Sequence, residues 1–187
     1  MMGKVTGFAL AIAPVLALAA CSSGADSDGD GKISREEAAE EAKSVKLNPG
    51  KWENKVEIVD VNLDDSKLPP GAEAMKEQMT KAMVGRVTTS SSCLTPEQAA
   101  KPEASFLAGA DNDKCEYKKF DLSGGKIDAE ISCRGDKDGQ NGDFTMDGRY
   151  DENSYEMTMV MNASSGDMGT MVIKAKSNAR RIGDCDD

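Results

Sequence analysis

The chain has 187 residues, which is enough for one ordinary domain and a short extension. Its 23 Lys and Arg against 33 Asp and Glu give a formal net charge of −10, so we expect no nucleic acid partner, because nucleic acids are bound through basic surfaces. The absence of His excludes imidazole ligation of zinc, haem or copper and excludes Ser-His and Cys-His catalysis.

The first twenty residues are typical of an export signal. A basic residue, Lys4, precedes an apolar run over 5–20 that is too short for a transmembrane helix. Small residues lead up to Cys21, and the sequence Leu-Ala-Ala-Cys over 18–21 resembles the lipobox of bacterial lipoproteins. We therefore interpret residues 1–20 as a lipoprotein signal peptide.

The lipobox resemblance implies that Cys21 becomes the acylated N-terminus of the mature protein and that the membrane is a partner through this residue. Ser22 in the next position favours the outer membrane, with the protein facing the periplasm. The alternative is an ordinary secretory signal in which Cys21 is incidental. In the lipoprotein interpretation, residues 21–25 form a short lipid-anchored linker.

Residues 26–37 fit the twelve-residue calcium loop of EF-hand proteins at every informative position. Ca²⁺ is a hard cation that prefers oxygen, and this loop offers carboxylates, a backbone carbonyl and a hydroxyl in the expected order. The candidate metal ligands are Asp26, Asp28, Asp30, Lys32, Ser34 and Glu37. Gly31 suits the sharp turn, and Ile33 is the apolar residue of the pattern.

Two plainer interpretations compete with calcium binding. The segment can be an acidic flexible spacer, and Ser34 with Glu37 forms a capping box for a helix that we expect to run to about residue 45. A spacer does not need Gly31, however, and a capping box does not need alternating Asp. Because the loop lacks a second EF-hand to pair with, we expect one weak Ca²⁺ site within a loop and helix over 26–46. Its dissociation constant is expected to be on the order of 10⁻⁴–10⁻³ M.

The remainder, residues 47–187, is predicted to be mainly β. We expect a curled antiparallel meander sheet or half-barrel with two short covering helices. Trp52, Val56 and Ile58 fall on one face of a predicted strand, and the apolar residues continue out of phase from Val59, which predicts a β-bulge. One helix follows Pro69 and Pro70, with its Met side chains in the core; the other begins near Thr95. The core residues expected from the first helix are Met75, Met79 and Met83.

Four Cys remain after Cys21, an even number that indicates two disulfides in an oxidising compartment. A Gly-Gly turn over 124–125 predicts a hairpin that pairs Phe120 with Ala129. One bulged residue at 118–119 then brings Tyr117 opposite Ile131 and Cys115 opposite Cys133. This register favours a Cys115–Cys133 bond and leaves Cys93–Cys185.

A second hairpin, turning over 151–154, places four Met side chains on one face: Met146, Met157, Met159 and Met161. A third strand over 171–175 fits beside them in the same phase. Three interpretations of the Met face remain open. It can be ordinary core, a pliable wall that holds an apolar ligand or lipid, or a Cu(I) site, since thioethers are soft ligands.

Several of these segments together resemble the bacterial domain-of-unknown-function family 3617. They are Leu-Asn-Pro-Gly-Lys-Trp over 47–52, Cys-Leu-Thr-Pro-Glu over 93–97, the Cys115 and Cys133 pair around a Gly turn, Gly-Arg-Tyr over 148–150, and the ending over 179–185. The resemblance implies an exported, often lipid-anchored, disulfide-tied β domain without an assigned activity. It provides no catalytic residues, and the loop over 26–37 lies outside it.

We therefore expect a non-enzymatic calcium-binding lipoprotein of the cell envelope, with the role of the β domain unassigned. The alternative is a periplasmic binding module that holds an apolar ligand or lipid on its Met-rich sheet. An enzyme is disfavoured because the remaining acidic clusters are typical of turns and solvated strand faces. The run from Asp136, for example, has Asn141 where a calcium loop needs Gly and Asp147 where it needs Glu.

Overall fold

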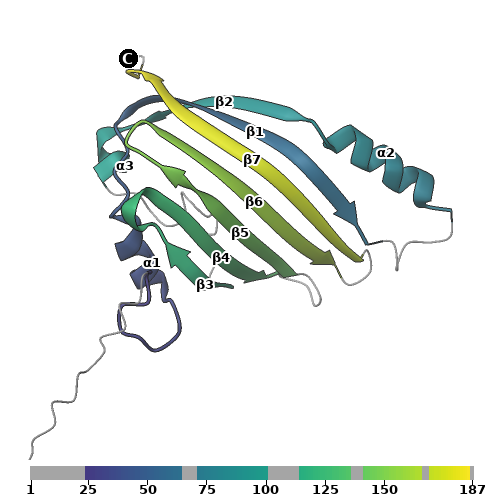
Figure 1. Ribbon diagram of the computed structural model, residues 1–187, viewed down its shortest axis with the longest axis horizontal. Coiled ribbons are helices and arrows are strands. Elements are labelled where there is room, and N and C mark those ends of the chain that lie inside the picture. Colours follow the sequence, from purple (N-terminus) through teal and green to yellow (C-terminus); the bar gives the residue numbers. More distant parts are fainter. Residues whose placement is uncertain (1–23, 65–70, 101–113, 136–140, 166–168, 186–187) are drawn as a thin grey trace, which may run out of the picture.

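The computed structural model describes residues 24–64, 71–100, 114–135, 141–165 and 169–185. A seven-stranded antiparallel sheet dominates it, with the strand order β2-β1-β7-β6-β5-β4-β3, and the described strands do not close into a barrel (Figure 1). The strands are β1 (Gly50–Leu63), β2 (Val87–Leu94), β3 (Cys115–Asp121), β4 (Lys126–Arg134), β5 (Asn141–Tyr150), β6 (Ser154–Ser165) and β7 (Gly169–Gly183). The α-helices are α1 (Arg35–Ala42), α2 (Glu73–Met83) and α3 (Pro96–Ala100). The mainly β prediction is confirmed.

Both predicted hairpins have the expected registers. The β3–β4 hairpin pairs Cys115 with Cys133, Tyr117 with Ile131, and Phe120 with Ala129, and its register shifts after Tyr117. The β5–β6 hairpin pairs Tyr150 with Tyr155, Gly148 with Met157, Met146 with Met159, and Phe144 with Met161. These pairings are determined by the apolar pattern, because a slip by one residue would turn every apolar side chain to the opposite face.

Strand β7 continues the meander and then joins the first strand of the domain. It pairs with β6 in the predicted phase, with Met159 opposite Ala175. Its other edge pairs with β1, where a register shift between Ile58 and Asp60 marks the predicted bulge. Strand β1 therefore lies between β2 and β7, so the ends of the domain are neighbours in the sheet.

These registers place most apolar side chains of β1 and of β3 to β7 on one side of the sheet, which we call the inner face, whereas Val87, Val160 and Val172 lie on the other side. Trp52, Met157 and Ile131 mark it on β1, β6 and β4. Gly148 lies on the same face, and a Cβ there would come within 2.2 Å of the Glu156 carbonyl oxygen. Only glycine fits at this close approach of β5 to β6.

The main core lies over β3, β4 and β5. Phe120, Leu122 and Ile131 are among the most deeply buried side chains, and the rings of Tyr117 and Phe120 meet edge to face at 5.3 Å. Residues 24–48, which we call the arm, cover this part of the sheet and contribute four residues to the same core: Ala25, Ala38, Ala42 and Val45. The helix that packs into this core is α1, at the opposite end of the molecule from α2 (Figure 1), and not one of the two helices that were expected to cover the sheet, in which no residue is buried.

Helix α2 corrects one prediction. None of its residues is buried, and Met75 and Met79 are 54% and 42% exposed. The expected packing of Met75, Met79 and Met83 into the core is therefore wrong. The helix connects β1 to β2 and extends beyond the ends of these strands, so its apolar stripe has little of the described sheet to pack against (Figure 1). None of the described helices is long and apolar enough to span a membrane.

Two disulfides join the Cys pairs that the sequence predicts. Cys115 and Cys133 connect neighbouring strands, with their Cα atoms 4.0 Å apart. Cys93 of β2 bonds to Cys185, which follows β7, and their Cα atoms are 5.6 Å apart. The second bond links segments 92 residues apart in sequence and ties the edge strand β2 to the C-terminal end of the domain.

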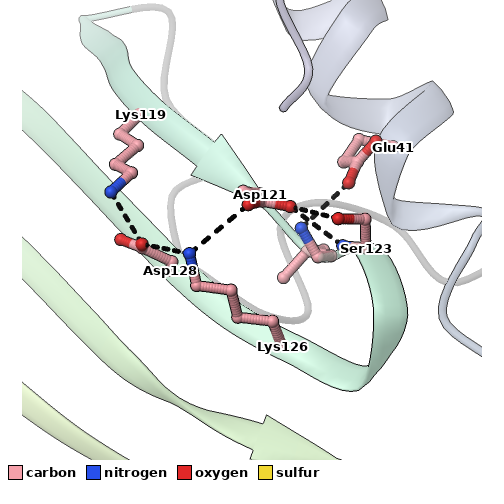
Figure 2. Close-up of polar contacts among 7 residues, drawn as sticks. Glu41, Lys119, Asp121, Ser123, Lys126 and Asp128 are labelled. Atoms are coloured by element: carbon pink, nitrogen blue, oxygen red, sulfur yellow. Dashed lines mark hydrogen bonds and ion pairs between the residues drawn. The ribbon is translucent and has the colours of Figure 1, made fainter. Parts of the chain in front are cut away.

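A polar network fastens the β3–β4 hairpin to helix α1 (Figure 2). Asp121 and Asp128 are direct cross-strand neighbours, an unfavourable pairing of like charges. Lys126 Nζ lies 2.7 Å from Asp128 and 3.4 Å from Asp121, which offsets the repulsion. From the helix, a Glu41 carboxylate oxygen accepts a hydrogen bond from the backbone N–H of Leu122 at 2.9 Å.

Candidate functional site

The acidic loop brings three of its predicted ligands together. Asp26, Asp28 and Asp30 each present a carboxylate oxygen, and these atoms lie within 4.8 Å of one another. Backbone N–H groups orient the side chains: the Gly29 and Gly31 N–H groups donate to the two carboxylate oxygens of Asp26 at 2.8 and 3.1 Å. Such a set of converging carboxylate oxygens suits a hard divalent cation.

Turns within the loop direct the other two carboxylates. Asp28 accepts from the Asp30 N–H at 3.1 Å, and Asp30 accepts from the Lys32 N–H at 2.8 Å. Gly31 has φ +81°, a left-handed conformation that side chains rarely adopt, so glycine is required at this turn of the loop. This backbone conformation explains why the calcium-loop pattern has glycine at the position of Gly31.

Glu37 lies beside the three Asp but outside their cluster. One of its carboxylate oxygens accepts from the N–H and hydroxyl of Ser27, and the other from those of Ser34, at 2.8–2.9 Å. These bonds, led by that of the Ser34 N–H, lower the pKa of Glu37 to about 2. The predicted capping box is present, because Ser34 Oγ also accepts from the Glu37 N–H. Glu37 is thus ionised and oriented at neutral pH.

The loop is attached to the β domain on both sides. Before it, the buried Ala25 donates its N–H to the carbonyl oxygen of Phe120 at 2.9 Å. Within it, Ile33 forms an isolated antiparallel bridge with Tyr117 of β3 and packs against the core. The segment that carries the candidate ligands therefore contacts the β domain through Ala25 and Ile33. Cys21, the predicted lipidation site, lies outside the described residues.

The predicted Met face is divided between two environments. Met146 is buried in the core at 5% exposure. Met157, Met159 and Met161 are half-buried on β6, and Met157 lines a cavity of about 330 Å³ on the inner face. The face thus contributes both to the core and to the wall of a hollow.

The residues that share this hollow were not recognised from the sequence. Asn54 of β1 and Ser90 of β2 line it, and they are direct cross-strand neighbours. The sequence signal was available: polar Asn54 interrupts the apolar alternation between Trp52 and Val56. It could not be interpreted because the pairing of β1 with β2 and β7 spans long sequence separations.

The fold and the loop define a class of protein: a disulfide-tied, mainly β domain with an open sheet and an acidic N-terminal arm. The family model described as a protein of unknown function, domain-of-unknown-function family 3617, matches residues 47–185. The chain belongs to this family, as its sequence resemblance predicts, and the acidic loop lies before the matched region. No curated protein matches the chain, and no solved structure matches it either.

Proposed function

We propose that this protein is a non-enzymatic calcium-binding lipoprotein of the bacterial cell envelope, with one Ca²⁺ site in loop 26–37. The observation that carries the proposal is the convergence of the Asp26, Asp28 and Asp30 carboxylates within 4.8 Å. Three carboxylates at such separations repel one another, and a divalent cation relieves this repulsion. Oxygen ligands are those that Ca²⁺ prefers.

Glu37 supplies the fourth carboxylate in this proposal. Two of its four hydrogen bonds come from the hydroxyls of Ser27 and Ser34, which can rotate away, whereas its two backbone donors keep the side chain in position. The backbone carbonyl of Lys32 and the hydroxyl of Ser34, directly or through water, complete the set. Because there is one loop and it lies at the surface, we expect weak binding, with a dissociation constant on the order of 10⁻⁴–10⁻³ M.

The position of the loop suggests where the ion acts. Four residue steps separate Cys21 from the docked Ala25, and an extended chain covers at most about 14 Å over four residues. An acylated Cys21 would therefore hold the calcium loop close to the membrane surface. Ca²⁺ in the loop would offset the repulsion between anionic head groups and a protein of formal net charge −10.

Isothermal titration calorimetry of the purified protein with CaCl₂ tests the metal site. We expect saturable binding of one ion, and at least a tenfold weaker affinity in Glu37→Gln, which keeps the capping box but removes a ligand charge. Glu36→Gln is the matched control, because Glu36 is the exposed neighbouring residue and is not a candidate ligand. Absence of heat at millimolar Ca²⁺, or equal affinities for the two variants, would contradict the proposal.

The membrane anchor has its own test. Cells expressing the protein are labelled with radioactive palmitate, and the envelope fraction is probed for the labelled protein. We expect label on the native chain and none on Cys21→Ser, because the acyl acceptor is the Cys thiol and the new N-terminus. An unlabelled native chain that is released in soluble form would show that the signal peptide is an ordinary secretory one.

A further inference from the structure

The cavity of about 330 Å³ is lined by parts of the chain that are distant in sequence. Ser90 and Ser92 of the edge strand β2 line it together with Leu122 and Ile127 beside the β3–β4 turn. These segments lie at opposite edges of the sheet, so the sheet curls around the hollow. Its volume falls in the range of small-molecule sites, roughly 300–1,000 Å³.

The walls are mainly apolar and uncharged. Among the described residues that line the cavity, none carries a formal charge. The indole N–H of Trp52 donates to the Asn48 carbonyl, and the hydroxyl of Tyr150 donates to the Leu122 carbonyl. Because their polar atoms are engaged elsewhere, these aromatic side chains offer mainly their apolar rings to a ligand.

Four polar side chains interrupt these walls, those of Asn54, Ser90, Ser92 and Gln98. Asn54 Oδ1 accepts a hydrogen bond from the buried Ser177 hydroxyl at 3.0 Å, so the amide N–H groups of Asn54 are the donors that remain for a ligand. Ser90 is the direct cross-strand neighbour of Asn54 and adds a hydroxyl. Tyr155, stacked on Trp52 at 6.5 Å, lines the same hollow. A neutral hydrogen-bond acceptor on a ligand therefore suits the Asn54 amide and the Ser90 hydroxyl.

An apolar track continues from the cavity along β6. Met157 lines the cavity, and Met159 and Met161 follow it on the same face, each half-buried. From Tyr155 to Met161 the strand covers about 20 Å, since each residue adds about 3.4 Å. Such a track suits a linear alkyl chain, and the flexible Met side chains can adapt to its shape.

We propose that the inner face binds a single-chain lipid with an uncharged head, of the acylglycerol class. The acyl chain lies in the cavity and along the Met track, and its ester carbonyl accepts hydrogen bonds from Asn54 and Ser90. A carboxylate head is disfavoured because no cation lines the described cavity and a buried unpaired charge is costly. Bound Ca²⁺ takes no part in this site.

The test uses the purified protein and the neutral dye N-phenyl-1-naphthylamine, whose fluorescence rises in apolar surroundings. We expect saturable enhancement with one dye per chain, and displacement by 1-monooleoylglycerol at concentrations at least tenfold lower than by oleate. Equal displacement by oleate would overturn the uncharged head group. Absence of saturable enhancement would overturn the site itself.

Two substitutions on one strand separate cavity binding from surface adsorption. Ser92→Phe adds a ring toward the cavity and is expected to weaken dye binding at least tenfold, whereas Ser91→Phe places the same ring on the outer face, opposite Glu53 of β1, and leaves binding within twofold. Ser90→Phe is a second cavity variant if Ser92→Phe does not fold. Equal dye affinities in the cavity and control variants would overturn the proposal.

Discussion

Two regions of the molecule, which we call the covered half and the open half, bury their side chains to different extents. The covered half consists of β3, β4, β5 and the arm, and it contains Phe120, Leu122 and Ile131, all at or below 1% exposure. The open half consists of β1, β2 and α2. No residue of β2 or α2 is buried, although α2 carries a regular Met stripe.

The difference shows that attachment, more than side-chain size, determines which helix covers the sheet. The apolar residues of helix α1 are all alanines, yet Ala38 and Ala42 are fully buried. Small side chains allow a close approach, and the chain on either side of α1 is fastened by the hydrogen bonds of Ala25 and Asn48 to the β domain. Helix α2 has larger apolar side chains but lies beyond the sheet. Stability is therefore expected to be uneven across the molecule.

The largest expected effect is at the disulfide of the open half. Replacing Cys93 and Cys185 by Ala releases a loop of 92 residues and is expected to lower the free energy of unfolding by about 4–5 kcal/mol, against about 3 kcal/mol for the Cys115 and Cys133 pair. Urea titration of both double variants measures the difference. Hydrogen exchange is expected to rise first in β2 when the Cys93–Cys185 bond is removed. A larger loss from the Cys115 and Cys133 pair would contradict the comparison.

Truncation of apolar side chains is the next test. Phe120→Ala is expected to cost about 3–5 kcal/mol, because Phe120 is fully buried beneath the arm and contacts the ring of Tyr117. Met79→Ala, in the open half, is expected to change stability by less than about 0.5 kcal/mol, since Met79 is 42% exposed. Urea titration of the two variants provides the comparison, and similar losses would show that α2 packs more tightly than its exposure indicates.

The local features of the covered half were predictable from the sequence. The Gly-Gly turn, the bulge near Lys118 and the Cys register follow from period-two alternation over a short stretch of chain, and the structure has all three. The three Asp of the loop are brought together by turns that involve neighbouring residues only. Short-range geometry of this kind leaves few alternatives.

The features of the open half depend on long-range pairing and were harder to predict. The Met stripe of α2 has helical period, but no local rule states whether a helix lies over a sheet or beyond its end. The cavity likewise requires that β2 and the β3–β4 turn, at opposite edges of the sheet, approach the same hollow. Sheet curvature determines that approach, and the sequence pattern alone does not specify it.

The smallest expected effect concerns acid stability at the contact between the arm and the hairpin. The Ser123 hydroxyl bonds to Asp121 and, together with Lys126, holds the pKa of Asp121 below its ordinary value of 3.8, although burial opposes the shift. A lowered folded-state pKa means that the ionised carboxylate stabilises the folded protein above the unfolded-state pKa. This contribution is lost as the pH falls through the folded-state value.

Urea titrations of the native protein and Asp121→Asn between about pH 7 and pH 2 measure this contribution. We expect the native protein to be more stable at neutral pH and the two curves to converge in acid, because a protonated Asp121 no longer attracts Lys126. Asp60→Asn, at an exposed position on β1, is the control and is expected to leave the acid profile unchanged. If the free energies of unfolding of the native protein and Asp121→Asn fall in parallel as the pH is lowered, the acid sensitivity belongs to other carboxylates. The contact between the arm and the β3–β4 hairpin would then depend on apolar packing alone.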